Sequence, residues 1–167
     1  MQAEQARFLL NFLLRQIEEE FATTKKVLAA LPEEQRDYRP HPIAKTALEL
    51  AWHAASSDLW FLDGIIRGQF AAEEPPAGPA TVAQLRDQYD KGFVELVARL
   101  KALSDEQLMR RIPFFGVLDV PAVSYLLWML VHTVHHRGQL STYLRAMGAK
   151  VPSIYGGSAD EPFQPPA

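Results

Sequence analysis

The chain has 167 residues, of which 48% are hydrophobic and 22% charged, so we expect one globular domain over residues 1–167 with its own core. The net charge of −3, the lack of a basic block and the lack of an apolar run of about 20 residues argue against binding to nucleic acid or insertion into a membrane. The absence of cysteine excludes disulfides, thiolate metal sites and cysteine nucleophiles, so any bound metal needs nitrogen and oxygen ligands.

Two amphipathic helices are expected in the first part of the chain. Residues 1–6 are polar and do not resemble a signal peptide, so we expect a cytoplasmic protein. The first helix covers about residues 5–30, where apolar side chains recur at steps of three and four. The second covers about residues 46–68. A capping-box pattern at Thr46 opens it, and Gly68 is a suitable stop.

Two more helices are expected in the second part. Residues 73–79 are rich in proline and predict a long connection. The third helix covers about residues 81–103, a single hairpin is expected at 112–119, and the fourth helix covers about 120–147. The tail from residue 150 is rich in proline and glycine and is expected to be irregular. These elements predict an all-α four-helix bundle with long connections and an irregular C-terminal tail.

Three of the five histidines lie close together on the expected fourth helix. His132 and His136 are four residues apart, which places their side chains one above the other on a helix. Two imidazoles at this spacing can bind one divalent metal ion. His132 and His135 form a second possible pair. His135 is also a candidate for lining a pocket and a weaker candidate for catalysis. The alternative is a helix whose histidines bind no metal.

A third ligand is expected from the second helix, where Glu49, His53 and Asp58 are the candidates. On a helical wheel His53 points almost opposite the main apolar stripe, so a solvent-exposed histidine is the alternative. That stripe comprises Leu48, Trp52, Ala55, Leu59, Leu62 and Ile66. We favour His53, because its own side of the helix is also partly apolar. Three neutral imidazoles leave a fourth position open, which is typical of catalytic zinc, and imidazole also suits nickel.

The expected substrate pocket lies on the histidine face of the fourth helix. Aromatic, methionine and amide side chains share that face, and this is the composition of a small-molecule pocket. The residues expected to form it are Tyr125, Trp128, Met129, Gln139 and Tyr143. His41 lies in a loop and is expected to be solvated.

Several motifs resemble the DinB/YfiT-like superfamily of metalloenzymes, the damage-inducible group and not the DNA polymerase of that name. The motifs are Tyr38-Arg-Pro-His-Pro, Ala47-Leu-Glu-Leu-Ala-Trp-His53, His132-x-x-x-His136-Arg-Gly-Gln139 and Leu144-Arg-x-x-Gly148. The resemblance implies a four-helix bundle, often dimeric, and a metal held by His53, His132 and His136. It also implies thiol-dependent chemistry, because relatives with assigned activities are bacillithiol transferases and mycothiol-dependent isomerases.

These observations leave three hypotheses about function. The first is a zinc- or nickel-dependent transferase that adds a low-molecular-weight thiol to a small electrophile, in a homodimer. The second is a hydrolase on the same metal, which needs a general base such as Asp58, Glu49 or His135. The third is a non-catalytic stress-response protein that binds metal.

Overall fold

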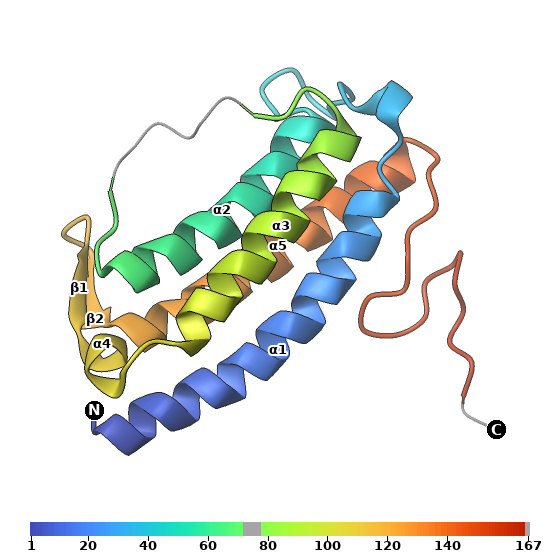
Figure 1. The fold of residues 1–167 in the computed structure, drawn as a ribbon. Coiled ribbons are helices and arrows are strands. Elements are labelled where there is room, and N and C mark those ends of the chain that lie inside the picture. The colour runs from blue at the N-terminus through green and yellow to red at the C-terminus, as the bar shows by residue number, and fades with distance from the viewer. Residues whose placement is uncertain (72–77, 166–167) are drawn as a thin grey trace.

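The computed structural model describes residues 1–71 and 78–165 of the chain (Figure 1). Its four long helices are α1 (Ala3–Ala29), α2 (Ala47–Arg67), α3 (Val82–Lys101) and α5 (Tyr125–Ala146). The shorter elements are η1 (Glu33–Gln35), α4 (Asp105–Met109), β1 (Arg111–Phe114), β2 (Leu118–Pro121) and η2 (Ala122–Ser124). The predicted all-α four-helix bundle and its irregular tail are confirmed. None of the helices in this described part combines the length and apolarity that a membrane crossing requires.

The helices form a bundle in which α2 packs against both α5 and α3, and α1 packs against α5 and α3 (Figure 1). The third helix runs in the same direction as the second, so α2 and α3 begin at the same end of the bundle. Most of the long connection expected at 73–79 lies outside the described residues. Beyond it, Gly78 lies against the indole of Trp52, near the start of α2.

The predicted start and stop of α2 are confirmed. The Glu49 amide donates to Oγ1 of Thr46 at 3.1 Å, and the Thr46 amide donates to Oε2 of Glu49 at 2.7 Å. These two reciprocal bonds satisfy backbone donors that the first turn would otherwise leave open. Gly68 ends the helix with a φ of 79°, a left-handed conformation that glycine adopts without a steric penalty.

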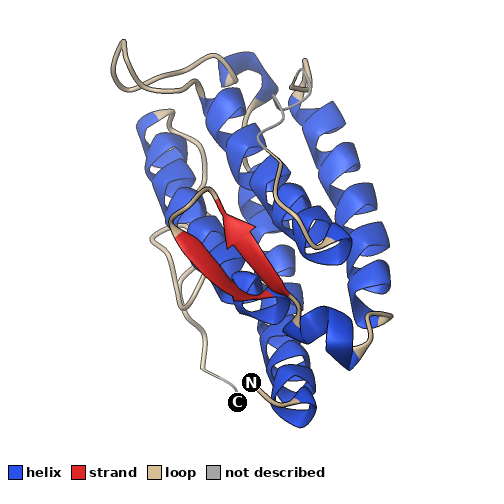
Figure 2. Ribbon diagram, turned by 90° about the vertical axis from the view of Figure 1, so that its left-hand side faces the viewer, coloured by secondary structure: helices blue, strands red, loops and turns tan. Residues whose placement is uncertain are grey.

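The two strands pair in antiparallel fashion and lie across one end of the bundle (Figure 2). This confirms the hairpin expected at 112–119. The fourth long helix begins at Tyr125 and not near residue 120, as the sequence had suggested. The reason is that Asp119 pairs with Pro113 in the hairpin, and the following Ala122–Ser124 form one 3-10 turn before the helix begins.

The face that α2 buries differs from the predicted stripe. The buried side chains of α2 include small and polar residues beside large apolar ones. They are Ala47, Leu50, Ala51, Ala54, Ala55, Asp58, Phe61, Leu62 and Ile65. Leu48, Trp52 and Leu59 are only half-buried, and Leu59 packs towards Gly92 of α3. The predicted stripe is therefore only partly confirmed, because Ala55 and Leu62 are fully buried. Its half-buried members mark the flank of α2 that faces α3.

Candidate metal centre

The rotation of α2 determines where His53 points. The buried face of α2 is centred on alanines. One flank of that face therefore faces α3, and the other flank, which carries His53, faces α5 instead of solvent. Small side chains at a helix contact permit a short distance between the axes. His53 is accordingly half-buried between the two helices, so the alternative of a solvent-exposed histidine does not hold.

Three histidines converge between α2 and α5. His53 contributes from α2, and His132 and His136 contribute from successive turns of α5. The Nε2 atoms of His53 and His136 are 3.2 Å apart, and one ring nitrogen of each of the three residues lies within 4.8 Å of the others. The ring centroids of His53 and His132 are separated by 5.1 Å. This cluster can hold one metal ion after small side-chain adjustments.

The three imidazoles are in an environment that disfavours their charged form. Burial lowers the pKa of His132 to about 4, with further lowering from the neighbouring histidines. Burial is also the main cause that lowers the pKa of His53 and of His136. The environment therefore favours the neutral form of all three rings, and the neutral ring is the form that binds a metal ion.

Gln139 determines the tautomer of His136. Its Oε1 atom lies 3.0 Å from Nδ1 of His136, and an amide oxygen can only accept a hydrogen bond. The proton of the neutral ring is therefore on Nδ1, and the lone pair on Nε2 points towards His53. Metal-binding histidines are commonly oriented in this way by a hydrogen bond to the other ring nitrogen.

His132 offers a further test of whether these residues fit a metal ion. Its Nδ1 atom is buried and has no hydrogen-bond partner among the described residues. Buried polar atoms are nearly always satisfied, so this ring requires a partner that the described side chains do not supply. Three neutral imidazoles and an unsatisfied ring nitrogen fit a divalent ion that prefers nitrogen ligands.

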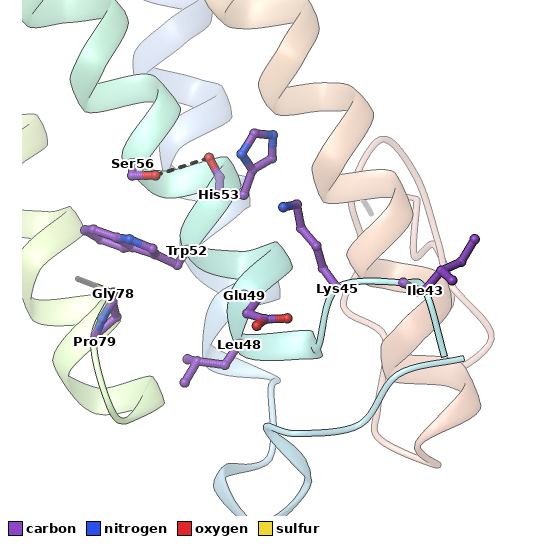
Figure 3. Close-up of a pocket in the computed structure, with 10 residues that line it drawn as sticks. Ile43, Lys45, Leu48, Glu49, Trp52, His53, Ser56, Gly78 and Pro79 are labelled. Atoms are coloured by element: carbon purple, nitrogen blue, oxygen red, sulfur yellow. Dashed lines mark hydrogen bonds between the residues drawn. The ribbon is translucent and has the colours of Figure 1, made fainter. Parts of the chain in front are cut away.

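A cavity of about 590 Å³ opens beside His53, at the N-terminal end of α2 (Figure 3). Its size is that of a small-molecule site. Its walls are formed by Ile43, Ala44, Lys45, Leu48, Glu49, Trp52, His53, Ser56, Gly78 and Pro79. A ligand in this cavity would have access to one of the three clustered histidines.

The five residues expected to form the pocket are not among the residues that line this cavity. Tyr125, Met129 and Tyr143 are buried in the core. Trp128 is 52% exposed on the outer surface of α5. Gln139 lies beside His136, where it accepts a hydrogen bond.

Asp58 lies in the interior of the bundle and is only 2% exposed. Tyr89 donates a hydrogen bond to its Oδ2 atom at 2.6 Å, and Thr133 donates to Oδ1. Burial raises its pKa to about 7. Its two oxygen atoms therefore serve a buried contact between α2, α3 and α5.

The other candidates for catalysis or metal binding lie around the cluster. Glu49 lines the cavity, but its carboxylate accepts the capping hydrogen bond from Thr46. His135 is exposed, and its ring centroid is 4.7 Å from that of His136. His41 is exposed in the loop before α2, as expected.

Two charged residues that the sequence did not mark as functional, Lys45 and Arg137, lie in notable positions. Lys45 lines the cavity, and its position directly before the N-cap of the helix that carries His53 was the available signal. Arg137 is 2% exposed and pairs with Glu20 of α1. In the sequence, Arg137 continues an apolar stripe of α5, and a charged residue at such a position indicates a buried ion pair.

Comparisons with known proteins agree with this architecture. The model of the DinB family matches residues 2–165. The uncharacterized protein YrdA of Bacillus subtilis (strain 168) is 30% identical over an alignment of 161 residues, and the match covers 91% of this chain and 91% of that protein. A DinB-like protein from Bacillus cereus ATCC 10987 is 28% identical with a TM-score of 0.74, covering 86% of this chain and 95% of that one.

A more distant structure shares the fold alone. A mutant of the mycothiol-dependent maleylpyruvate isomerase is 14% identical with a TM-score of 0.59, and the match covers 92% of this chain and 66% of that one. The family match spans both helices that carry the clustered histidines. The chain belongs to the DinB family.

Proposed function

We propose that this protein is a metal-dependent enzyme that joins a low-molecular-weight thiol to a small electrophile. One observation carries the proposal: three neutral imidazoles converge beside an open cavity of small-molecule size. Zinc or nickel is the expected ion, because both accept three imidazole ligands. When bound, such an ion lowers the pKa of a thiol ligand and so increases the thiolate fraction at neutral pH.

The chain's own residues would hold and orient the reacting groups. His53, His132 and His136 would bind the ion, and Gln139 would keep Nε2 of His136 available for it. The cavity next to His53 would hold the substrate. The mycothiol-dependent isomerase that shares this fold supports thiol chemistry as the first to test.

The hydrolase alternative finds less support in the geometry. A hydrolase needs a group that can take a proton from water near the metal. Asp58 is buried and hydrogen-bonded, and the carboxylate of Glu49 already accepts a hydrogen bond from Thr46. His135 is exposed next to His136 and is the remaining candidate of the three.

The decisive experiment compares the wild type with a His132→Ala/His136→Ala variant. Elemental analysis should find about one equivalent of zinc or nickel in the wild type and none in the variant. Turnover is then measured with a thiol and an activated aryl chloride, in which a sulfur–carbon bond forms, chloride leaves and the thiol proton passes to solvent. Turnover should stop on chelation and return with the metal.

Two results would reject this proposal in different ways. A bound metal without turnover would indicate a protein that binds metal without catalysis. No metal in either protein, with both equally folded, would mean that the histidines have a structural role. His41→Ala, in the exposed loop, is the matched control and should retain the metal.

A homodimer is part of the same proposal. Exposed apolar side chains on the outer surface of α5 are suitable for burial against a second copy, because such patches commonly mark interfaces. They are Leu127, Trp128 and Val131. Light scattering should find a dimer for the wild type and a folded monomer for Trp128→Glu/Val131→Glu. A monomeric wild type would overturn this expectation.

A further inference from the structure

The backbone around Lys45 is fixed relative to both helices that carry the clustered histidines. Its carbonyl oxygen accepts a hydrogen bond from the Tyr143 hydroxyl of α5 at 3.2 Å. The next residue, Thr46, is the N-cap of α2, and the amide of Ala47 donates to the carbonyl of Tyr38 at 2.8 Å. Lys45 therefore has a defined position beside the cluster, although its side chain is exposed.

The Lys45 side chain lines the cavity, and its amino group points towards the ring of His53 (Figure 3). Within residues 1–71 and 78–165, no carboxylate lies within ion-pair distance of this ammonium group. The pairs that do form there use other cations: Arg7, Lys25, Arg36, Arg67, Lys91, Arg99, Lys101, Arg111, Arg137 and Arg145.

A cation in this position is unfavourable for a site that binds a metal ion through neutral ligands. The charges of the ion and of Lys45 have the same sign, and the three imidazoles contribute none to offset them. Among the described residues that line the cavity, Glu49 is the one carboxylate, and its Oε2 atom accepts the hydrogen bond from Thr46. The excess positive charge favours a ligand that carries a negative group in addition to its sulfur.

The rest of the cavity wall suits the carbon skeleton of such a ligand. Leu48, Trp52 and Pro79 supply apolar surface. The indole Nε1 of Trp52 is buried and has no hydrogen-bond partner among the described residues. The cavity thus offers a cation and an apolar wall close to a clustered histidine.

We propose that Lys45 selects a thiol that carries a carboxylate, with the carboxylate paired to the ammonium group and the sulfur directed to the three histidines. This inference rests on the proposed thiol chemistry and specifies the class of thiol. Lys45 is a specificity-determining residue in this arrangement. A carboxylate paired with an ammonium group at the edge of an apolar cavity forms a charge-assisted hydrogen bond, which is stronger than the bond that a hydroxyl group would form.

The test compares thiols that differ only in charge. Binding of 3-mercaptopropionate and 6-mercaptohexanoate to the zinc-loaded protein is measured by calorimetry at low salt, each against the alcohol of the same length. The wild type should bind the better carboxylate about tenfold more tightly than its alcohol. In Lys45→Gln that ratio should fall to about one with binding of the alcohol unchanged. Lys26→Gln, on the surface of α1, makes the same change in net charge and should keep the wild-type ratio.

A second measurement does not depend on thiols. Without any added anion, Lys45→Gln should bind zinc more tightly than the wild type, because a repelling charge is removed. Equal binding of acids and alcohols by the wild type, or a ratio that Lys45→Gln leaves unchanged, would overturn the role of Lys45 while thiol chemistry stands. Failure of every thiol to bind would reject the proposed function together with this inference.

Discussion

The Nδ1 atom of His136 lies 3.0 Å from Oε1 of Gln139, less than one turn further along α5. This contact fixes the tautomer of His136, so Gln139→Ala should weaken zinc binding by about 10- to 100-fold, the usual effect of losing such a partner. Gln139→Glu keeps an acceptor at the same place and should retain most of the affinity. Competition with a chromogenic chelator measures both variants. Equal affinity in wild type and Gln139→Ala would show that the contact does not orient the ring.

The metal-free protein should lose stability in acid because of His132. Its pKa of about 4 in the folded state is below the ordinary 6.5, so the unfolded chain binds more protons between these values. The free energy of unfolding should therefore fall as the pH is lowered from about 6.5 to about 4. Urea unfolding of chelator-treated protein at several pH values measures this.

The matched variants for that experiment are His132→Leu and His41→Leu. The first removes the buried titrating ring and should lose less stability in acid than the wild type. The second alters an exposed loop histidine and should follow the wild type. An identical pH profile for wild type and His132→Leu would contradict the assignment of this acid sensitivity to His132.

The spacing of apolar residues predicted the four-helix bundle well, because the long helices have clear apolar repeats and capping residues, as at Thr46. The helical wheel misplaced the centre of the buried face of α2, because it gave weight to large side chains, whereas Ala51 and Ala54, which it left out, are buried there. Large side chains such as Trp52 lie on the flanks of that contact. The orientation of a helix with two apolar flanks depends on its neighbours, and these are not visible in local sequence.

The candidate site was predictable to the extent that its residues share one helix. The pairing of His132 and His136 follows from their spacing alone, and the structure places them together. His53 was favoured because its side of the helix is partly apolar, and the resemblance supported that choice. Its convergence with His132 and His136 depends on the contact between α2 and α5, which the helical wheel does not show. Lys45 required the fold of the loop before α2, where hydrogen bonds to Tyr38 and Tyr143 hold the backbone.

Asp58 should make the protein less stable as the pH rises from about 4 to about 7. Burial raises its folded-state pKa from 3.8 to about 7, so the folded protein binds more protons than the unfolded chain between these values. The stability that the protonated carboxyl contributes is therefore present in acid and is lost between about pH 4 and pH 7. The stability of the wild type relative to Asp58→Asn should fall across this range, as measured by urea unfolding.

Asp63→Asn is the matched control on the same helix, because Asp63 is near the surface in an ion pair with Arg67. The difference in the free energy of unfolding between the wild type and this variant should show no comparable fall across the same pH range. Taking differences between variants also cancels the opposite effect of the histidines. A constant difference between wild type and Asp58→Asn from pH 4 to pH 7 would contradict the raised pKa.

The ion pair between Arg137 and Glu20 should make a large contribution to stability, because Arg137 lies inside the protein. Their side chains are 1% and 18% exposed, and the Tyr155 hydroxyl donates to Oε2 of Glu20 at 3.0 Å. Glu20→Ala would leave a buried guanidinium group without its counter-charge and should destabilise the protein by about 3 kcal/mol or more. Glu18→Ala removes the partner of Lys101 from the surface of the same helix and should cost less than about 1 kcal/mol. Similar losses in the two variants, measured by urea unfolding at pH 7, would show that burial does not set the strength of the Arg137 pair.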